Sequence, residues 1–275
     1  MILENLYQLI WQMQNSILSL SNTILDKTFP ILPESLVDQL KNCQTFGQQC
    51  TSKWKNPTYM LAKYVIKGPF PINSSRIEKI RYFQKELAKM NHMCHVPVQL
   101  YCDKNNQIWS CSPNLGNLPE KKNLKWGIIH KWSGQEGFII PRDGNADVTR
   151  ATDYLKTHNG QMPSLECWRQ LFQHLIDRFL IGAGDSGLWN ILMVKDENEQ
   201  YGVFGVDMEE NRGNLEATNA LEMFFSGKRG FAKKYLPNVK KAFLACYDQL
   251  IVAGGYERSI QAKKCLERSY IEWSK

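Results

Sequence analysis

The chain has 275 residues, of which 43% are hydrophobic and 22% charged. With 18 glycines and 11 prolines, this composition excludes a collagen-like, low-complexity or small disulfide-rich protein and requires a hydrophobic core. Because about 150 residues is a common domain size, the length suits one large domain or two smaller ones and can enclose a ligand cleft.

The formal net charge of +7 at pH 7 favours acidic partners such as nucleotides, nucleic acids or anionic membranes. No apolar run approaches the roughly 20 residues of a membrane-spanning helix. Residues 1–25 contain Glu4 and many Gln and Asn, unlike a secretory signal. We therefore expect an intracellular, cytoplasmic protein with reduced cysteines. His92, Cys94 and His95 are close in sequence, but no second ligand pair follows, so we do not expect a zinc site.

In the first half, the chain order predicts a small antiparallel sheet that carries one helix. Apolar residues from Ile2 to Ile24 recur at steps of three and four, which predicts an amphipathic helix packed on the rest of the protein. An extended run from Thr58 to Phe70 follows. Ser74 or Ser75 can cap a helix from Arg76 to Met90. Three strand candidates come next, at 96–102, 107–112 and 125–132, the first two joined by a hairpin turn.

The second half changes character at residues 134–147, which are rich in Gly, Pro and Asp and predict a hinge or loop. Ser164 then caps a helix that Gly182 and Gly184 end. A hairpin follows, with strands at 191–194 and 201–206, and residues 215–273 are helical in pattern with a break at Gly254-Gly255.

Three polar residues stand around this predicted hairpin. Asp185 and Asn190 are separated by four residues directly before an apolar strand, and Asp207 follows the second strand. This order is the D-x-x-x-x-N arrangement of a kinase catalytic loop followed by a metal-binding aspartate. Carboxylate and amide oxygens can hold Mg²⁺ on the phosphates of ATP, while the loop aspartate orients the attacking hydroxyl.

This stretch resembles the phosphoinositide-kinase-like (atypical protein and lipid kinase) branch of the protein-kinase superfamily, whose pattern is G-x-G-D-R-H-x-x-N-I, a hairpin, then Asp-Phe-Gly. The matching residues are Gly182, Gly184, Asp185, Asn190, Ile191 and Asp207. The resemblance implies that Asp185 is the catalytic aspartate and that Asn190 and Asp207 bind Mg²⁺ or Mn²⁺. Ser186 and Gly187 replace the Arg-His pair, and Met208-Glu209 replaces Phe-Gly.

A kinase also needs a cation on the nucleotide phosphates, held on a strand and paired with a helix carboxylate. Lys67 ends the sequence Tyr-Val-Ile-Lys and resembles the lysine of V-A-I-K. Glu86 on the following helix is its expected partner, with Glu78 as the competing carboxylate. Lys63 lies four residues earlier, on the same expected face, and either lysine could serve. The alternative is that these residues are ordinary surface charges.

The resemblance implies an α+β, two-lobed protein-kinase-like fold with a small antiparallel-sheet N-lobe and a mainly helical C-lobe. The expected parts are the N-terminal helix at 1–29, the N-lobe at 30–133 and the C-lobe at 134–275. Backbone groups of Ile129, His130 and Lys131 are the candidate contacts for the adenine of ATP.

The expected activity is transfer of the γ-phosphoryl group of ATP to a hydroxyl. The segment after Asp207 contains Glu209, Glu210, Glu216 and Glu222, so it suits a basic protein substrate better than a phosphoinositide. A protein Ser/Thr kinase is therefore favoured. The alternatives are a phosphoinositide kinase and a pseudokinase scaffold without activity. A basic cluster at 228–241 is either a solvated helix face or a contact for anionic membranes or nucleic acid.

Overall fold

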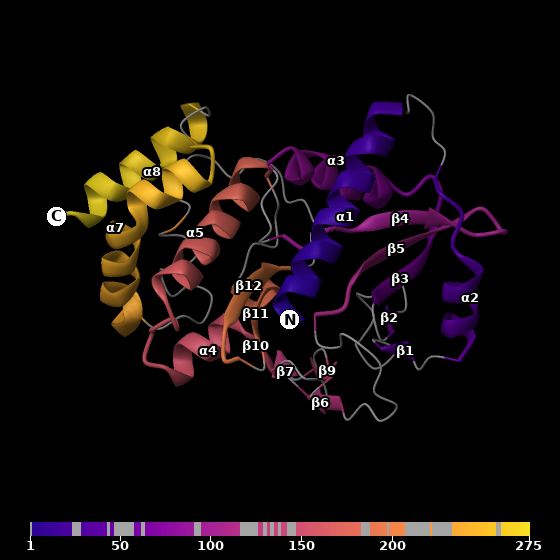
Figure 1. The fold of residues 1–275 in the computed structure, drawn as a ribbon, viewed down its shortest axis with the longest axis horizontal. Coiled ribbons are helices and arrows are strands. Elements are labelled where there is room, and N and C mark those ends of the chain that lie inside the picture. Colours follow the sequence, from indigo (N-terminus) through magenta and orange to yellow (C-terminus); the bar gives the residue numbers. More distant parts are fainter. Residues whose placement is uncertain are drawn as a thin grey trace. The chain divides into compact units, whose positions relative to one another are not determined.

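The structure is a computed structural model. It describes residues 2–23, 29–42, 45–46, 58–61, 64–90, 95–115, 126–128, 131–132, 135–136, 139–141, 147–182, 188–196, 198–206, 221, 233–256 and 260–275. Within these residues the protein is α+β, with seven α-helices and antiparallel sheets (Figure 1). None of the described helices is both long enough and apolar enough to cross a membrane.

The chain divides into two compact units, which are described separately. The first comprises Met1–Ala88, Val96–Val148 and Val194–Gln200, and the second comprises Lys89–His95, Thr149–Met193 and Tyr201–Lys275. The domain boundaries expected from the sequence stay predictions.

The first unit is built on a five-stranded antiparallel sheet in the order β1-β2-β3-β5-β4. Its strands are β1 (Thr45–Phe46), β2 (Thr58–Met60), β3 (Tyr64–Pro71), β4 (Gln99–Cys102) and β5 (Gln107–Pro113). The single extended run expected from Thr58 is therefore two strands. The N–H of Leu61 donates to the carbonyl of Tyr64 over 2.7 Å, because the chain reverses there and β2 pairs with β3.

Both faces of this sheet are covered, and β3 contributes to each of them. Ile66 packs in a cluster with Leu36 of α2 (Glu34–Lys41), whereas Phe70 packs in a cluster with Ile77 of α3 (Ser75–Met90). Residues four apart on a regular strand would point to one face. The register shifts between Lys67 and Phe70, so this bulge turns Phe70 to the opposite face.

The two long helices of the first unit follow the predicted periodicity. α1 (Ile2–Thr23) has the expected extent to within one residue, and the buried apolar residues in its described part fall on one stripe: Leu3, Leu6, Ile10 and Met13. α3 begins at the predicted cap, since Oγ of Ser74 accepts from the N–H of Arg76 over 3.4 Å. Its described buried apolar residues are Ile77, Ile80, Phe83 and Leu87. Ile77 and Ile80 bury apolar area against residues of the sheet.

The segment from 126 to 141 differs from the prediction of one strand and one loop. It contains four short strands, β6 (Trp126–Ile128), β7 (Lys131–Trp132), β8 (Gln135–Glu136) and β9 (Ile139–Pro141). β6 pairs with β9 and β7 pairs with β8, both antiparallel. The β7–β8 pair lies between β6 and β9 in the sequence. Part of the segment expected to form a hinge, β8 and β9, therefore pairs with the strands that precede it.

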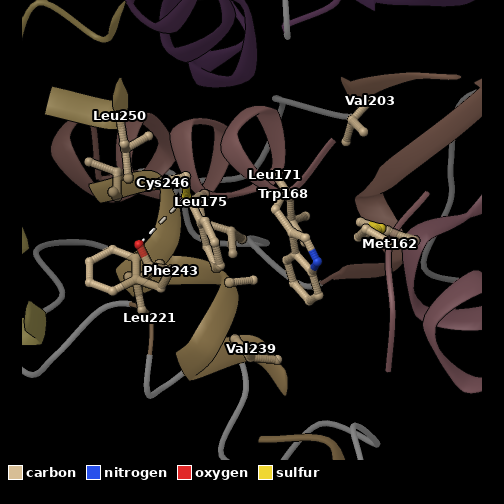
Figure 2. Packing of buried hydrophobic residues seen from close by; sticks show 14 of the residues in the cluster. Met162, Trp168, Leu171, Leu175, Val203, Leu221, Val239, Phe243, Cys246 and Leu250 are labelled. Carbon is tan, nitrogen blue, oxygen red and sulfur yellow. Dashed lines mark hydrogen bonds between the residues drawn. The ribbon is translucent and has the colours of Figure 1, made fainter. Parts of the chain in front are cut away.

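The core of the second unit forms around α5 (Leu165–Leu180), together with α4 (Ala151–Thr157), α7 (Leu236–Ala253) and α8 (Ile260–Trp273). Figure 2 shows side chains of α5 and α7 meeting in this cluster. Phe243 lies edge-on to both Phe172 and Trp273, with ring centroids 5.4 and 5.2 Å apart. The predicted ends of α5 are confirmed: Ser164 Oγ accepts from the N–H of Cys167, and Gly182 has φ +70°.

A three-stranded sheet, in the order β10-β11-β12, has most of its residues in the second unit. Its strands are β10 (Asp147–Arg150), β11 (Ile191–Lys195) and β12 (Tyr201–Gly205). The predicted β11–β12 hairpin is present, and Oδ1 of Asp196 accepts from the N–H groups of Asn198 and Gln200, each over 2.9 Å. The N–H of Val203 donates to Oε1 of Gln170 over 3.0 Å, which attaches β12 to α5.

Candidate functional site

The sequence-predicted site residues are only partly described. Asn190 lies in the second unit, and Lys67 and Glu86 lie in the first. Lys131 lies in β7. The remaining candidates, Asp185, Asp207, Lys63, Ile129 and His130, lie outside the described residues.

Asn190 ends a short 3-10 helix, η1 (Leu188–Asn190), directly before β11. It is 7% exposed, and its backbone carbonyl accepts from the N–H of Val206 over 2.9 Å. This hydrogen bond brings the backbone of Asn190 beside Val206, the residue before Asp207 in the sequence, although 16 positions separate 190 from 206.

The other backbone group of Val206, its carbonyl, is bound by an arginine of α5. Nη1 of Arg178 donates to this carbonyl oxygen over 2.9 Å. Arg178 is fully buried, with 0% exposure. Both backbone groups of Val206 are thus hydrogen-bonded within the second unit, which fixes the end of β12.

Arg178 belongs to a buried chain of polar side chains. Its Nη1 lies 3.4 Å from Nε2 of His174, and Nδ1 of His174 lies 3.0 Å from Nδ1 of His95. Nε2 of His95 lies 2.8 Å from Oδ2 of Asp177. All four residues are buried, and buried polar groups are stable only when hydrogen-bonded.

The hydrogen-bond donors in this row of buried side chains can be assigned by starting from Arg178. A guanidinium only donates, so Nε2 of His174 accepts from Arg178 and Nδ1 of His174 carries the proton. Nδ1 of His95 then accepts, and its Nε2–H donates to the carboxylate of Asp177. Every hydrogen bond runs from Arg178 towards Asp177, with two neutral imidazoles between a cation and an anion. Burial lowers the pKa of His174 well below its usual value, and His95 and Arg178 lower it further.

Tyr256 completes the network at the carboxylate end. Its hydroxyl contacts Oδ1 of Asp177 in a short hydrogen bond and lies 3.2 Å from the carbonyl oxygen of Gln173. Since a hydroxyl has one proton and Gln173 offers only an acceptor, the proton is shared between these two oxygens. The carboxylate of Asp177 is therefore bound through both oxygens, by His95 and by Tyr256.

The ring of His174 fits against β12 because residue 205 is glycine. A Cβ atom at Gly205 would lie 1.7 Å from Cε1 of His174 and 2.0 Å from its Nδ1, which no side chain can accommodate. His95 also forms an isolated β-bridge with Gly205. The glycine of the Gly205-Val206-Asp207 sequence thus allows the imidazole chain to lie directly beside the strand.

In the first unit, the strand register assigns a face to Lys67. Lys67 pairs with Ser110, and Ser110 pairs with Leu100; directly paired residues point to the same face. Leu100 belongs to the cluster that packs against α3, so Lys67 lies on the face that α3 covers. Glu86 of α3 is half-buried, whereas Glu78 is exposed. These positions favour Glu86 over Glu78 as a partner for a strand lysine.

The residues of the buried network were not among the candidates predicted from the sequence. His174, Asp177 and Arg178 are spaced at i, i+3 and i+4, which places them on one side of the helix. Polar residues at this spacing inside a strongly apolar helix were the available signal. In the described ranges, no group of three or more His, Cys, Asp or Glu could hold a metal ion. His95, considered above for zinc, engages both ring nitrogens in the network.

No protein-family model matches the chain, and a search of curated proteins finds none that matches it significantly. A function is therefore inferred from the residues of the chain and their geometry.

Proposed function

We propose that the chain is a phosphotransferase that moves the γ-phosphoryl group of ATP to a hydroxyl, with the two-lobed fold of the phosphoinositide-kinase-like branch. The observation that supports this most is the hydrogen bond between Val206 and Asn190. It brings the backbone of the D-x-x-x-x-N asparagine beside the residue that precedes Asp207, which is the spatial relation that the sequence motif requires.

Each residue has a role in this proposal. Asn190 and Asp207 would hold Mg²⁺ or Mn²⁺, and the side-chain amide oxygen of Asn190 is a hard ligand that fits such an ion. When bound, the metal ion neutralises charge on the phosphates. Lys67 would bind phosphate oxygens, and Glu86 would orient Lys67.

The reaction itself would use Asp185. The carboxylate of Asp185 accepts the proton of the substrate hydroxyl, whose oxygen bonds to the γ-phosphorus. The bond from that phosphorus to the β–γ bridging oxygen breaks, and ADP leaves with the bond electrons.

A protein hydroxyl is the favoured acceptor. The stretch after Asp207 is acidic over residues 209–222. Such a stretch attracts Lys and Arg around a Ser or Thr and repels a phosphorylated inositol headgroup. We therefore propose a protein Ser/Thr kinase that prefers basic sequences.

The test is phosphate transfer from γ-labelled ATP to a library of basic Ser/Thr peptides, with Mg²⁺ or Mn²⁺. We expect Asp207→Ala and Asn190→Ala to lower turnover by at least a hundredfold, because each removes a ligand of the metal ion. The unfolding midpoint of Asp207→Ala should stay near that of the wild type. Asp248→Asn, an exposed acid on α7, is the matched control and should keep full turnover. Wild-type turnover in Asp207→Ala would refute the proposal.

One alternative has its own support, a pseudokinase that binds nucleotide without transferring phosphate. Ser186, Gly187 and Met208 depart from the residues of active relatives in this branch. A thermal-shift titration with Mg²⁺-ATP separates the two. A shift without loss of the γ-phosphate supports the pseudokinase, whereas a shift with turnover excludes it.

A further inference from the structure

We propose that Arg178 is a positioning residue for the metal-binding end of β12, and that the buried His174–His95–Asp177 chain holds its guanidinium in place. This inference rests on the proposed function, because it assigns the purpose of the network to the orientation of Asp207. The network itself, and its hydrogen bonds to the backbone of Val206, stand independently of that function.

Val206 lies between two peptide planes, and each plane is held by a hydrogen bond. The N–H of Val206 belongs to the plane shared with Gly205, and it is held by the carbonyl of Asn190. The carbonyl of Val206 belongs to the plane shared with Asp207, and it is held by Arg178. Peptide units are planar and rigid, so fixing both planes sets the direction in which the chain leaves Val206.

Arg178 is itself held in place by the buried polar side chains around it. Its guanidinium is fully buried, and a buried charge is costly unless it is paired and hydrogen-bonded. Among the described residues, hydrogen bonds through two imidazoles connect the guanidinium to the carboxylate of Asp177. Since each member of the chain has a defined donor and acceptor, rotation of any one ring would break bonds on both sides.

Most of the buried network is carried by a single helix of the core. His174, Asp177 and Arg178 lie on α5, the helix at the centre of the core of the second unit. Tyr256 holds the far end of the chain at Asp177. A site group supported by buried hydrogen bonds from a packed helix is more precisely placed than one on a free loop. Ser186 and Gly187 stand where the branch has Arg-His, whereas α5 carries a guanidinium and an imidazole beside Val206 and Gly205.

The experiment measures amide hydrogen exchange of Val206 without any ligand, using the amide of Val203 as an internal reference. Val203 is bonded to Gln170 and does not depend on Arg178. The variants are Arg178→Met and Arg178→Gln, neither of which can donate to the Val206 carbonyl, and Arg178→Lys, which retains a donor. Arg169→Met is the matched control, since Arg169 lies on the same helix and bonds to Glu166 and Gln173.

We expect Val206 to exchange at least tenfold faster in Arg178→Met and Arg178→Gln, with Val203 unchanged, and to recover at least partly in Arg178→Lys. In the phosphotransfer assay, the same two variants should need at least tenfold more Mg²⁺ for half-maximal turnover. Their kcat should fall, while the KM for ATP changes less. Arg169→Met should match the wild type in both measurements.

Two results would overturn the inference. One is a Val206 amide that exchanges as fast as an exposed amide in the wild type, a measurement that needs no variant to fold. The other is unchanged Val206 exchange, or an unchanged Mg²⁺ requirement, in a folded Arg178→Met or Arg178→Gln. If the wild type shows no turnover, the proposed function fails and the positioning of Asp207 for catalysis fails with it. The exchange data then still decide whether Arg178 orders this strand end.

Discussion

A methyl group added at residue 205 tests the packing of His174 against β12. In Gly205→Ala the new Cβ would lie 1.7 Å from Cε1 of His174, while ordinary contact begins at 3.4 Å. The ring must therefore retreat by about 1.7 Å, or the strand must move by a similar amount. His174 is bound over 3.0 and 3.4 Å, and a shift of this size breaks both hydrogen bonds.

The expected cost follows from these two losses. Buried groups left without partners cost about 1–3 kcal/mol each, and overpacking adds about 1–3 kcal/mol. We expect Gly205→Ala to lower the free energy of unfolding by about 3–9 kcal/mol, a large share of the roughly 5–15 kcal/mol typical of a folded protein. Urea unfolding, analysed by midpoint and slope, measures this loss.

A double-mutant cycle with His174→Ala shows whether the ring is the cause. When the imidazole is absent, the methyl group at residue 205 has room, and Gly205→Ala should add little further loss. The coupling energy between the two positions should be at least about 2 kcal/mol. A loss below about 1 kcal/mol for Gly205→Ala, or an equal loss with and without His174, would refute the packing that places the imidazole chain beside the strand.

Two further predictions concern pH. Because the pKa of His174 is lowered by burial, and further by His95 and Arg178, the unfolded chain takes up a proton near pH 6.5 that the folded protein does not. Stability should fall from pH 7.5 to 5.5, by at most about 1.4 kcal/mol per pH unit from this group. In urea unfolding at both pH values, His174→Gln should show a dependence weaker by about 1 kcal/mol, and an equal dependence would contradict the assignment. Burial raises the pKa of Asp103, but hydrogen bonds from Trp109, Gln107 and Asn105 outweigh it and leave the pKa lowered. The stability that the ionised Asp103 carboxylate contributes is therefore present above its ordinary pKa and is lost as acid protonates the carboxylate in the folded protein. Asp103→Asn should cost about 1 kcal/mol at pH 7 and little near pH 2 in thermal unfolding, whereas an equal cost at both would contradict this.

Local signals in the sequence predicted most of the helices and hairpins. The cap at Ser164, the glycine at 182 and the polar turn after β11 each act over a few residues, so the sequence alone reveals them. The two strands that begin at Thr58 were harder to predict from the sequence. Both strands of the β2–β3 hairpin are rich in β-formers, and only tertiary pairing decides where such a run turns back.

The candidate site was only partly predictable, for a similar reason. The order of Asp185, Asn190 and Asp207 is visible in one stretch of sequence, as is the glycine at 205. The buried network is not, because it joins His95 to residues about 80 positions later in the chain. A contact of that kind has no local pattern, and the spacing of the polar residues on α5 indicates only that they share a side of the helix.

The bulge in β3 constrains how this sheet can change over time. Removing one residue between Lys67 and Phe70 would shift the phase of the strand and turn Phe70 towards α2, so that α3 would lose an apolar partner. Gly68 adds a second restriction, since it has φ +143° and a Cβ there would approach Cε3 of Trp109 to 3.0 Å. Evolution can substitute one apolar side chain for another along this strand. Insertions and deletions are expected only in the turns beyond its ends. Distant relatives that retain this sheet should align with residues 64–71 without a gap.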